Sequence, residues 1–324
     1  MPYPFGLVRG VVPSSRTRTV NAGRGSRQPV RAYRPSAEFP RHLEELYARF
    51  PFDRSLADDP ISLVRPLAVD LRHAEVAGVF ASTLAIGNTT AIRGAVARLA
   101  GLADGDVAWL VSPGHARERA RRLASFRHRW IRGDQLDYLA RVLETYYRHR
   151  PSLESAFVEG FTDGGFAGGL DELSRVLRAD ALRGRLGPPP RGYRALFPSP
   201  RDTAASPCKR LTLFVRWMVR DRYPDLGVWR RVPTGELRIP LDQHVHWIAY
   251  HLGLTGRRTR SWAAVEEVSE ALRRVDPLDP VKYDFVLCHT GISGDCPKER
   301  DIAVCGPCSV RPDCRLWRGR TVTT

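Results

Sequence analysis

Apolar residues recur at intervals of three and four positions through most of the chain after Arg41, which is the spacing of one face of an α-helix. The interval is clearest in residues 74–86, 134–147, 205–220 and 242–252. No segment shows the convincing alternation of apolar and polar residues that is typical of a strand. The pattern therefore predicts an all-α fold.

Three positions predict where helices begin. Asp242 and Ser261 each precede an apolar segment of helical period, and both residue types accept hydrogen bonds from the free N–H groups of a first turn. Asp279-Pro280 combines an acid with a proline, which is another common helix start. The stretch 184–207 is rich in Pro, Gly and Arg and instead predicts a long connection.

The termini and the hydropathy pattern limit where the protein acts. The chain has no run of about 18 apolar residues and no apolar secretory core near its N-terminus, so we expect a cytoplasmic protein without a membrane span. Residues 1–38 hold seven arginines and no acid before Glu38, which predicts a disordered basic arm. The composition leaves open whether this arm tracks DNA phosphates or is an inert tail.

The net charge of the chain indicates which class of partner it binds. The chain carries 51 Lys and Arg against 35 Asp and Glu, a formal net charge of +16. This excess favours nucleic acid as a partner, although a GC-rich genome also enriches arginine. Only three of the basic residues are lysines, namely Lys209, Lys282 and Lys298. Because an amine can lose its proton and attack carbon, whereas a guanidinium stays charged, these three are the candidate nucleophiles.

Five of the six cysteines lie in residues 288–314. The last four follow the spacing C-x8-C-x2-C-x5-C, and they are Cys296, Cys305, Cys308 and Cys314. In a cytoplasmic chain this density favours a metal centre over disulfides. Four thiolates suit both zinc and a [4Fe–4S] cluster, so the ligand set alone does not decide between them. Cys288 is the spare cysteine, expected on the preceding helix and facing the core.

Two motifs resemble the endonuclease III branch of the helix-hairpin-helix DNA glycosylase superfamily. The cysteine spacing resembles its C-terminal [4Fe–4S] loop, with the first interval two residues longer. Residues 239–245, I-P-L-D-Q-H-V, resemble its signature, in which an aspartate at a helix start is essential for base excision. The resemblance implies that Asp242 is the catalytic carboxylate, that His244 is its structural neighbour, and that the four cysteines hold a [4Fe–4S] cluster, with zinc as the alternative.

Lys209 stands at the head of the 205–220 helix, where bifunctional members of this superfamily carry a lysine that attacks the sugar C1′ and forms a Schiff base. Their hairpin reads L-P-G-[VI]-G-x-K-T-A, whereas residues 203–209 read T-A-A-S-P-C-K, without glycine. Lys209 precedes Asp242 by 33 residues, and this long separation resembles the archaeal 8-oxoguanine glycosylases. The chain is also similar to a poorly characterised bacterial branch of the superfamily over about residues 41–290.

The resemblance also suggests which residues contact the substrate. The superfamily holds an extruded base between two helical domains, stacked on aromatic or apolar groups. Candidate pocket residues are Asn88, Trp217 and Trp247, with Phe285 as a further aromatic. Arg210, Lys298 and Arg300 are expected to contact the DNA backbone. Lys282, the rival amine, is expected to form an ion pair with Asp279 or Asp284.

The architecture that the resemblance implies is two helical domains with a cleft between them. Residues 39–73 and 243–324 would form one domain, which ends in the iron–sulfur loop 296–314. Residues 74–242 would form the helical barrel domain, with an atypical hairpin at about 203–220.

The implied function is base-excision repair by a monomeric enzyme on double-stranded DNA of the nucleoid. A glycosylase activity would excise a damaged base, expected to be an oxidised one, and Lys209 would add AP lyase activity. Two alternatives stay open: a monofunctional glycosylase with water as the nucleophile, and a non-catalytic, zinc-containing DNA-binding protein. The sequence names neither the damaged base nor the opposite-base preference.

Overall fold

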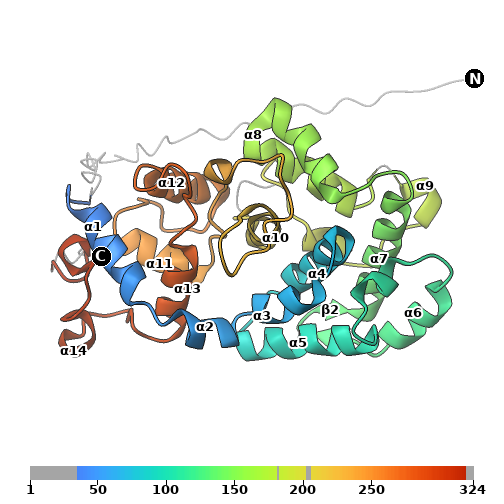
Figure 1. Cartoon of the computed structure of the whole chain (residues 1–324), viewed down its shortest axis with the longest axis horizontal. Coiled ribbons are helices and arrows are strands. Elements are labelled where there is room, and N and C mark those ends of the chain that lie inside the picture. The colour runs from blue at the N-terminus through green and yellow to red at the C-terminus, as the bar shows by residue number, and fades with distance from the viewer. Residues whose placement is uncertain (1–34, 181, 202–205, 319–324) are drawn as a thin grey trace, which may run out of the picture. The chain divides into compact units, whose positions relative to one another are not determined.

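The computed structural model describes residues 35–180, 182–201 and 206–318, and these residues are mostly helical, with almost no strand (Figure 1). The predicted all-α fold is confirmed at this level. The one sheet among the described residues is a two-stranded antiparallel hairpin of β1 (Arg127–His128) and β2 (Ile131–Arg132). Residues 1–34 of the predicted basic arm lie outside the described residues.

The helices follow one another with short connections. The N-terminal half contains α1 (Phe39–Arg49), α2 (Phe52–Asp58), α3 (Ile61–Val64), α4 (Leu71–Thr83), α5 (Thr89–Leu102), α6 (Ala116–Leu123), α7 (Gly133–Tyr147) and α8 (Leu153–Leu177). The C-terminal half contains α9 (Arg183–Leu186), α10 (Lys209–Val219), α11 (Gln243–His251), α12 (Trp262–Arg273), α13 (Asp284–Ile292) and α14 (Ile302–Cys305). Short 3₁₀ turns lie at Arg65–Leu67, Val107–Val111, Tyr193–Leu196, Thr234–Glu236 and Arg311–Asp313.

Two hydrophobic cores organise these helices. The larger core is built around α4, α7, α8 and α10, and α4 packs closely on α10. The smaller core is built around α1, α11, α12 and α13. Ile61, Val64 and Val281, which the predicted boundaries assign to the terminal domain, pack in the larger core.

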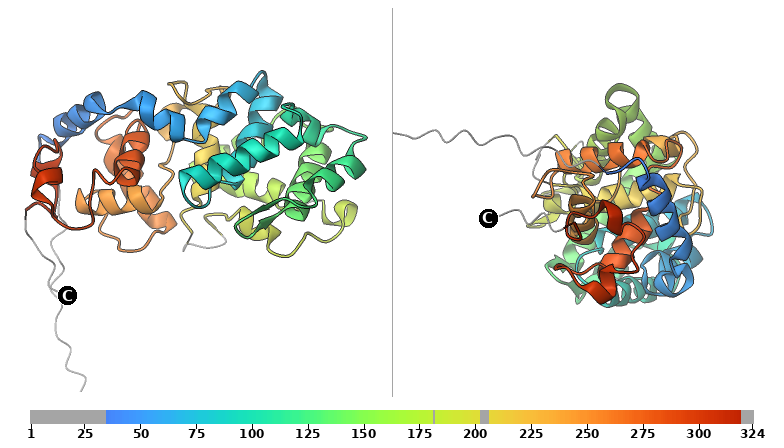
Figure 2. Two further views of the ribbon diagram at one scale, coloured as in Figure 1. Left: turned by 90° about the horizontal axis from the view of Figure 1, so that it is seen from below. Right: turned by 90° about the vertical axis from the view of Figure 1, so that its left-hand side faces the viewer.

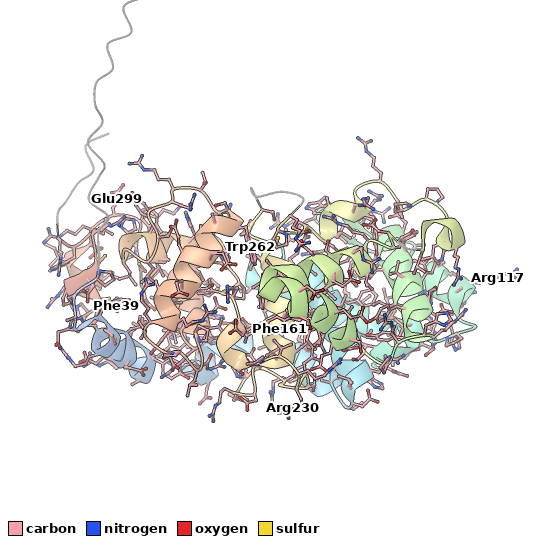
Figure 3. All side chains as sticks on the ribbon, turned by 90° about the horizontal axis from the view of Figure 1, so that it is seen from above. Phe39, Arg117, Phe161, Arg230, Trp262 and Glu299 are labelled. Carbon is pink, nitrogen blue, oxygen red and sulfur yellow. The ribbon has the colours of Figure 1, made fainter. Side chains whose placement is uncertain are left out.

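Trp262, the first residue of α12, contacts both cores. Its ring stacks on Phe166 of the larger core with the centroids 6.5 Å apart and the planes 8° from parallel. Figure 3 labels Trp262 and also Phe161, a partly buried residue that packs against the larger core. A single large aromatic side chain therefore ties α12 to α8.

Helix α8 changes direction at Gly165, where φ is +58° and ψ is −155°. Only glycine adopts this conformation without strain, because it has no Cβ. The two halves of α8 then meet at Gly160 and Gly168, where a Cβ on either residue would lie 2.2–2.3 Å from the other residue's carbonyl oxygen. The glycine-rich sequence of this segment therefore allows one helix to fold back on itself.

A buried carboxylate joins the elements of the larger core. Glu75 of α4 is fully buried and accepts hydrogen bonds from the Leu153 N–H, the Tyr147 hydroxyl and the Trp229 indole N–H, all at 2.8–3.0 Å. Burial raises the pKa of the Glu75 carboxyl, although all of these donors oppose the rise. Glu75 therefore links α4 to α7, to α8 and to the segment after α10.

Helix α1 is joined to the C-terminal segment. The Asp313 carboxylate lies 2.7 Å from His42 Nδ1 of α1 and accepts a hydrogen bond from the Ser36 N–H at 2.7 Å. All views in Figures 1 and 2 place the blue α1 beside the red C-terminal segment. The first and last parts of the described chain are therefore fixed to each other.

Two of the three predicted helix starts are confirmed. Asp242 caps α11 and Ser261 caps α12, each by accepting backbone N–H bonds. The start at Asp279-Pro280 was wrong, because residues 280–283 form a turn and α13 begins at Asp284. The Asp279 carboxylate is bound by Arg220 at 2.9 Å, so it does not cap a helix.

No helix in the part of the chain that the structure describes combines the length and apolar character needed to cross a membrane.

Candidate active site

A pocket of about 620 Å³ opens between the elements of the two cores. Its walls come from the first turn of α10, the start of α11, one face of α13 and the Gly87–Asn88 turn before α5. Both residues that the sequence singles out for catalysis, Lys209 and Asp242, line it. Pockets of this size accommodate a small organic group.

Asp242 is held at the N-terminus of α11. One carboxylate oxygen, Oδ1, accepts the His244 and Val245 N–H groups at 2.8 Å each, so it satisfies two free donors of the first turn. The residue is 9% exposed. Burial favours the neutral acid, but the Lys209 ammonium and the Val245 N–H outweigh it and hold the pKa of Asp242 below its ordinary value. Asp242 is therefore an ionised carboxylate whose second oxygen faces the pocket residues described next.

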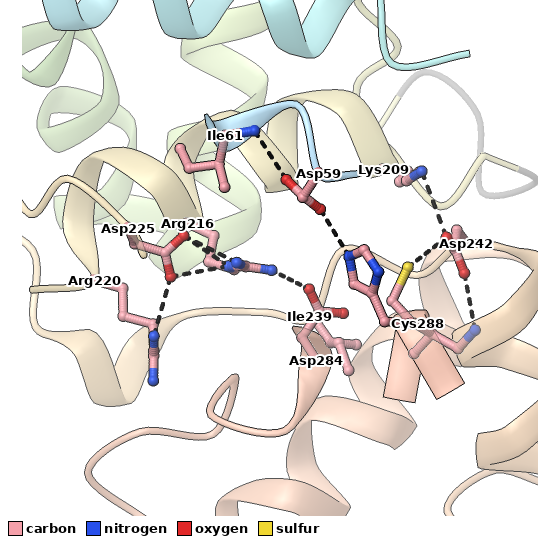
Figure 4. Close-up of polar contacts among 12 residues, drawn as sticks. Asp59, Ile61, Lys209, Arg216, Arg220, Asp225, Ile239, Asp242, Asp284 and Cys288 are labelled. Atoms are coloured by element: carbon pink, nitrogen blue, oxygen red, sulfur yellow. Dashed lines mark hydrogen bonds and ion pairs between the residues drawn. The ribbon is translucent and has the colours of Figure 1, made fainter. Parts of the chain in front are cut away.

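Lys209 is the first residue of α10, as the sequence predicts. Cys208 before it has a φ of +50°, in the left-handed region that non-glycine residues rarely adopt, and its N–H donates to Ser206 Oγ at 3.2 Å. This turn directs the Lys209 side chain toward α11. Its Nζ lies 3.6 Å from Asp242 Oδ2, and the side chain is 30% exposed (Figure 4).

Cys288 of α13 completes a three-residue group. Its thiol donates a hydrogen bond to Asp242 Oδ2 at 3.3 Å, which is the oxygen nearest Lys209 (Figure 4). Burial raises the pKa of this thiol well above its ordinary value, and the neighbouring Asp242 charge raises it further. Cys288 is therefore a neutral donor. We expected it to face the core; it contacts the smaller core and also reaches the pocket.

Behind this group lies a buried ion-pair network. Arg216 of α10 binds Asp225 with two nitrogens, the shortest contact being 2.9 Å, and also binds Asp284 of α13. Arg220, the residue directly after α10, binds Asp225 at 3.2 Å. Burial raises the pKa of the Asp284 carboxyl to about 6, Arg216 opposes the rise, and the Asp242 charge adds to it. The network fixes α10 against α13 and so sets the spacing between their pocket residues.

A second polar pair, Asp59 and His289, lines the same pocket. His289 Nε2 of α13 lies 3.0 Å from Asp59 Oδ2, and Asp59 Oδ1 accepts the Ile61 N–H at 2.9 Å. The His289 ring stacks on Phe285 with centroids 4.3 Å apart. Asp59, Phe285 and His289 all line the pocket. This wall therefore offers an aromatic face and an imidazole held by a carboxylate.

The predicted base-pocket residues fall in different places. Asn88 lines the pocket and caps α5 by accepting the Ala91 N–H at 2.8 Å. Trp217 and Phe285 also line it, and Trp217 is almost fully buried in the larger core. Trp247 is not among the lining residues; its ring lies edge-on to His251 with centroids 4.1 Å apart.

The predicted DNA-contacting residues are likewise divided. Arg210 lines the pocket next to Lys209. Lys298 and Arg300 are exposed in the segment between α13 and α14, and the Arg300 guanidinium lies 4.5 Å from the centre of the Trp317 ring. Lys282 does not pair with Asp279 or Asp284.

The Lys282 prediction was wrong because both expected acids are bound by arginines: Asp284 by Arg216 of α10 and Asp279 by Arg220 just after it. Its ammonium instead binds Glu44 of α1 at 2.6 Å and lies 3.8 Å from Asp276. Lys282 is not among the pocket residues, so Lys209 is the lysine beside Asp242.

The four C-terminal cysteines follow α13, in residues 296–314. Burial raises the pKa of the Cys296 thiol to about 12, and the three other thiols add to the rise. Cys296, Cys308 and Cys314 pack against the smaller core. Among the described residues, however, no three His, Cys, Asp or Glu side chains converge closely enough to hold a metal ion. The donor chemistry suits a thiolate-bound metal, and the side chains are not gathered around one point.

Sequence reasoning missed three pocket residues: Asp59, Cys288 as a partner of Asp242, and His289. Spacing within α13 offered one signal, because Asp284 and Cys288, like Phe285 and His289, are four positions apart and share a helix face. Asp59 lies 230 residues from His289 in the sequence, and no local pattern connects them.

Comparison with known proteins adds one finding. A family model described as a protein of unknown function, DUF2400, matches residues 59–293. Every residue that lines the pocket falls within this segment, which ends before Cys296. Neither the comparison with curated proteins nor the one with solved structures returned a match.

Proposed function

This chain belongs to the DUF2400 family of unknown function, and we propose that it is a DNA glycosylase that excises a damaged base with Asp242 and Lys209. The observation that carries the proposal is the position of Lys209 Nζ, 3.6 Å from a buried Asp242 carboxylate inside a pocket of about 620 Å³. An amine and a carboxylate at this separation can act on the same sugar carbon.

Each side chain has a defined role in the proposed reaction. Asp242 stabilises the positive charge that develops on the sugar as its bond to the base breaks. The Lys209 amine, once it has given up its proton, bonds to C1′ while the base leaves with the electron pair of the broken bond and takes up one proton. Loss of the amine proton and opening of the sugar ring give a Schiff base, from which elimination of the 3′ phosphate cleaves the strand.

The chemical character of the pocket walls suits a planar aromatic substrate. Phe285 and Trp217 offer apolar surface, and His289 and Asn88 offer polar groups at the rim and wall. An extruded base needs such a combination, because its faces stack on apolar groups while its edges form hydrogen bonds. The net charge of +16 supports a polyanionic partner. As the sequence suggested, an oxidised base in double-stranded DNA is the substrate we propose, and the enzyme acts as a monomer.

One observation favours the monofunctional alternative. Lys209 lies at ion-pair distance from Asp242, an arrangement that stabilises the ammonium rather than the free amine. In that case water would attack C1′, and Lys209 would balance the charge of Asp242. The two versions differ in whether a covalent intermediate forms.

We further propose that Cys296, Cys305, Cys308 and Cys314 bind a [4Fe–4S] cluster, with zinc as the alternative. The sequence spacing of the four cysteines and the packing of Cys296, Cys308 and Cys314 against the smaller core support four-thiolate binding. The metal would brace the exposed segment that carries Lys298 and Arg300 and would take no part in catalysis. Absorbance near 400 nm together with iron and zinc analysis of the pure protein distinguishes the two metals. Absence of both metals from protein purified without oxygen would overturn this part of the proposal.

The test of the catalytic proposal is borohydride trapping on duplexes that carry 8-oxoguanine, an oxidised pyrimidine or an abasic site. We expect the wild type to form a covalent adduct, and Lys209→Gln to form none. Lys282→Gln is the matched control. It removes a lysine that lies in the turn before α13, binds Glu44 and is not among the pocket residues. Asp242→Asn should lose base release while still binding the duplex. Base release that persists in Asp242→Asn would overturn the assignment, and base release without an adduct would establish the monofunctional version.

A further inference from the structure

The β1–β2 hairpin ends in a two-residue turn, Arg129–Trp130, that exposes an aromatic side chain. Trp130 is 45% exposed, although most large hydrophobic side chains of the described chain are buried. Arg129 has a φ of +55°, which is uncommon for a residue other than glycine. Strained backbone at an exposed position often serves a function rather than stability.

The hairpin is held firmly beneath this turn. Ile131 is fully buried in the larger core. His128 Nε2 lies 3.0 Å from both the Leu84 and the Ile86 carbonyl oxygens, so its N–H is shared between them. Burial lowers the pKa of His128, which keeps the ring neutral in this position. Trp130 is therefore presented on a rigid support and loses little conformational freedom when it binds a partner.

The turn lies at the rim of the pocket. The Arg129 guanidinium packs over Gly87, where an added Cβ would lie 2.9 Å from its nitrogens. Arg210 approaches from the other side, with its Cζ 5.7 Å from the centre of the Trp130 ring. Gly87 and Arg210 both line the pocket, so Trp130 stands next to its opening on the Lys209 side.

The arginines beside Trp130 are not neutralised by acidic side chains of the described chain. Among the described residues, Arg129 and Arg210 form no ion pair with a carboxylate, whereas Arg216 of α10 and Arg220 just after it are paired. Arg98 and Arg127, which lie at the base of the hairpin, also form no ion pair with a described carboxylate. Arg98 and Arg127 contact backbone carbonyls. Arg210 donates one N–H to the Ala195 carbonyl at 2.9 Å and leaves its Nη1 buried without a partner. This cluster is suited to an anionic partner.

We propose that Trp130 stacks on a DNA base at the mouth of the pocket, while Arg129 and Arg210 contact the adjacent phosphates. An aromatic ring between unpaired guanidinium groups matches the alternation of flat bases and charged phosphates along a nucleic acid strand. A protein surface that covered a lone tryptophan would not require Arg129 and Arg210 beside it without ion-pair partners. The inference rests on the proposed function, because it takes DNA as the ligand of the pocket.

The test is equilibrium binding of the full chain to a fluorescein-labelled duplex that carries a tetrahydrofuran abasic analogue, measured by anisotropy. This probe has no base to release and no C1′ hydroxyl, so binding is separated from chemistry. Trp130→Ala should weaken binding roughly 5- to 100-fold, the range expected for loss of one stacked base. Trp130→Phe should retain most of the affinity, because its ring still stacks.

Tyr223→Ala is the matched control. Tyr223 is also exposed, at 60%, and also has an arginine over its ring, Arg65 at 5.0 Å, but it is not among the pocket residues. The Tyr223→Ala variant should bind the abasic duplex with the same affinity as the wild type. Because Trp130 is 45% exposed and lies outside both hydrophobic cores, its replacement should change the thermal midpoint of unfolding only slightly.

The salt dependence of binding separates stacking from charge. Arg129→Ala should lower the slope of log K against log salt concentration by about one, since one phosphate contact is lost. Trp130→Ala should leave that slope unchanged. If Trp130→Ala binds within twofold of a wild type that itself binds, the stacking inference is overturned and the proposed function stands. If the wild type does not bind the abasic-analogue duplex, both the stacking inference and the proposed function are overturned.

Discussion

Lys209 and Asp242 lie 33 positions apart in the sequence, and their charged groups lie 3.6 Å apart in the fold. Each stands at the start of its own helix, Lys209 at the first residue of α10 and Asp242 at the cap of α11. The pocket therefore brings together two helix N-termini, whose partial positive charges favour the ionised form of Asp242. The charge state of this pair decides which reaction the pocket can support.

Lys209→Met should raise the pKa of the Asp242 carboxyl. Burial favours the neutral acid, and the Lys209 ammonium is the largest of the influences that oppose it, so removing the ammonium leaves burial less opposed. A ¹³C-NMR titration of aspartate carboxyl groups measures this change, with Asp242→Asn identifying the signal. Lys282→Met is the control and should leave the Asp242 titration unchanged, because Lys282 binds Glu44 instead. An unchanged titration in Lys209→Met would show that the pair does not interact in solution.

Cys288→Ala should slow base release about 2- to 10-fold, the usual worth of one hydrogen bond to a buried group. The variant removes the thiol that donates to Asp242 Oδ2 at 3.3 Å, so the carboxylate loses one of the contacts that fix its orientation. Single-turnover rates of base release measure the effect. Cys288→Ser keeps a donor at this position and should restore most of the rate. Equal rates in the alanine variant and the wild type would exclude a positioning role.

Asp284 should make the protein's stability depend on pH in an unusual direction. Burial raises the pKa of its carboxyl to about 6 from an ordinary value of 3.8, so between these values the folded chain binds a proton at Asp284 that the unfolded chain does not. The contribution of Asp284 to stability therefore increases as the pH falls from about 6 toward 4. Asp284→Asn should remove this contribution.

Chemical denaturation of the wild type and Asp284→Asn at several pH values measures the effect. The free energy of unfolding of the wild type, relative to the variant, should be higher at pH 5 than at pH 7.5. Asp242 acts with the opposite sign, because its pKa lies below the ordinary value: its contribution is present above pH 3.8 and is lost as the pH falls through the lower value. A stability difference that does not vary with pH would contradict the buried, proton-binding state of Asp284.

The sequence allowed the helices to be predicted where the information is local. Apolar spacing located α4 and α7, and the capping residue located the start of α11, because these features depend on neighbours within a few positions. The sequence did not predict the β1–β2 hairpin, because two-residue strands cannot show an alternating pattern.

The rest of the site depends on contacts between distant segments. Asp279 looked like a helix cap, but Arg220, 59 positions earlier, binds its carboxylate. The Asp59–His289 pair and the Cys288–Asp242 hydrogen bond likewise join residues that become neighbours only after α10, α11 and α13 have packed. The resemblance to glycosylases located Lys209 and Asp242, and it carried no information about these surrounding groups.

Gly87→Ala should destabilise the pocket rim, whereas Gly101→Ala should not. Gly87 has a φ of +111°, and an added Cβ would lie 2.9 Å from the Arg129 guanidinium, so both backbone strain and displacement of Arg129 oppose the substitution. We expect a loss of about 1–3 kcal/mol in the free energy of unfolding. Gly101 lies in α5 with open space around it, so alanine there should add about 0.5–1 kcal/mol. Urea denaturation of both variants measures the two effects. Arg129 belongs to the turn that carries Trp130, so Gly87→Ala should also weaken binding to the abasic duplex. If the variant is destabilised but binds this duplex as tightly as the wild type, the pocket rim takes no part in DNA recognition.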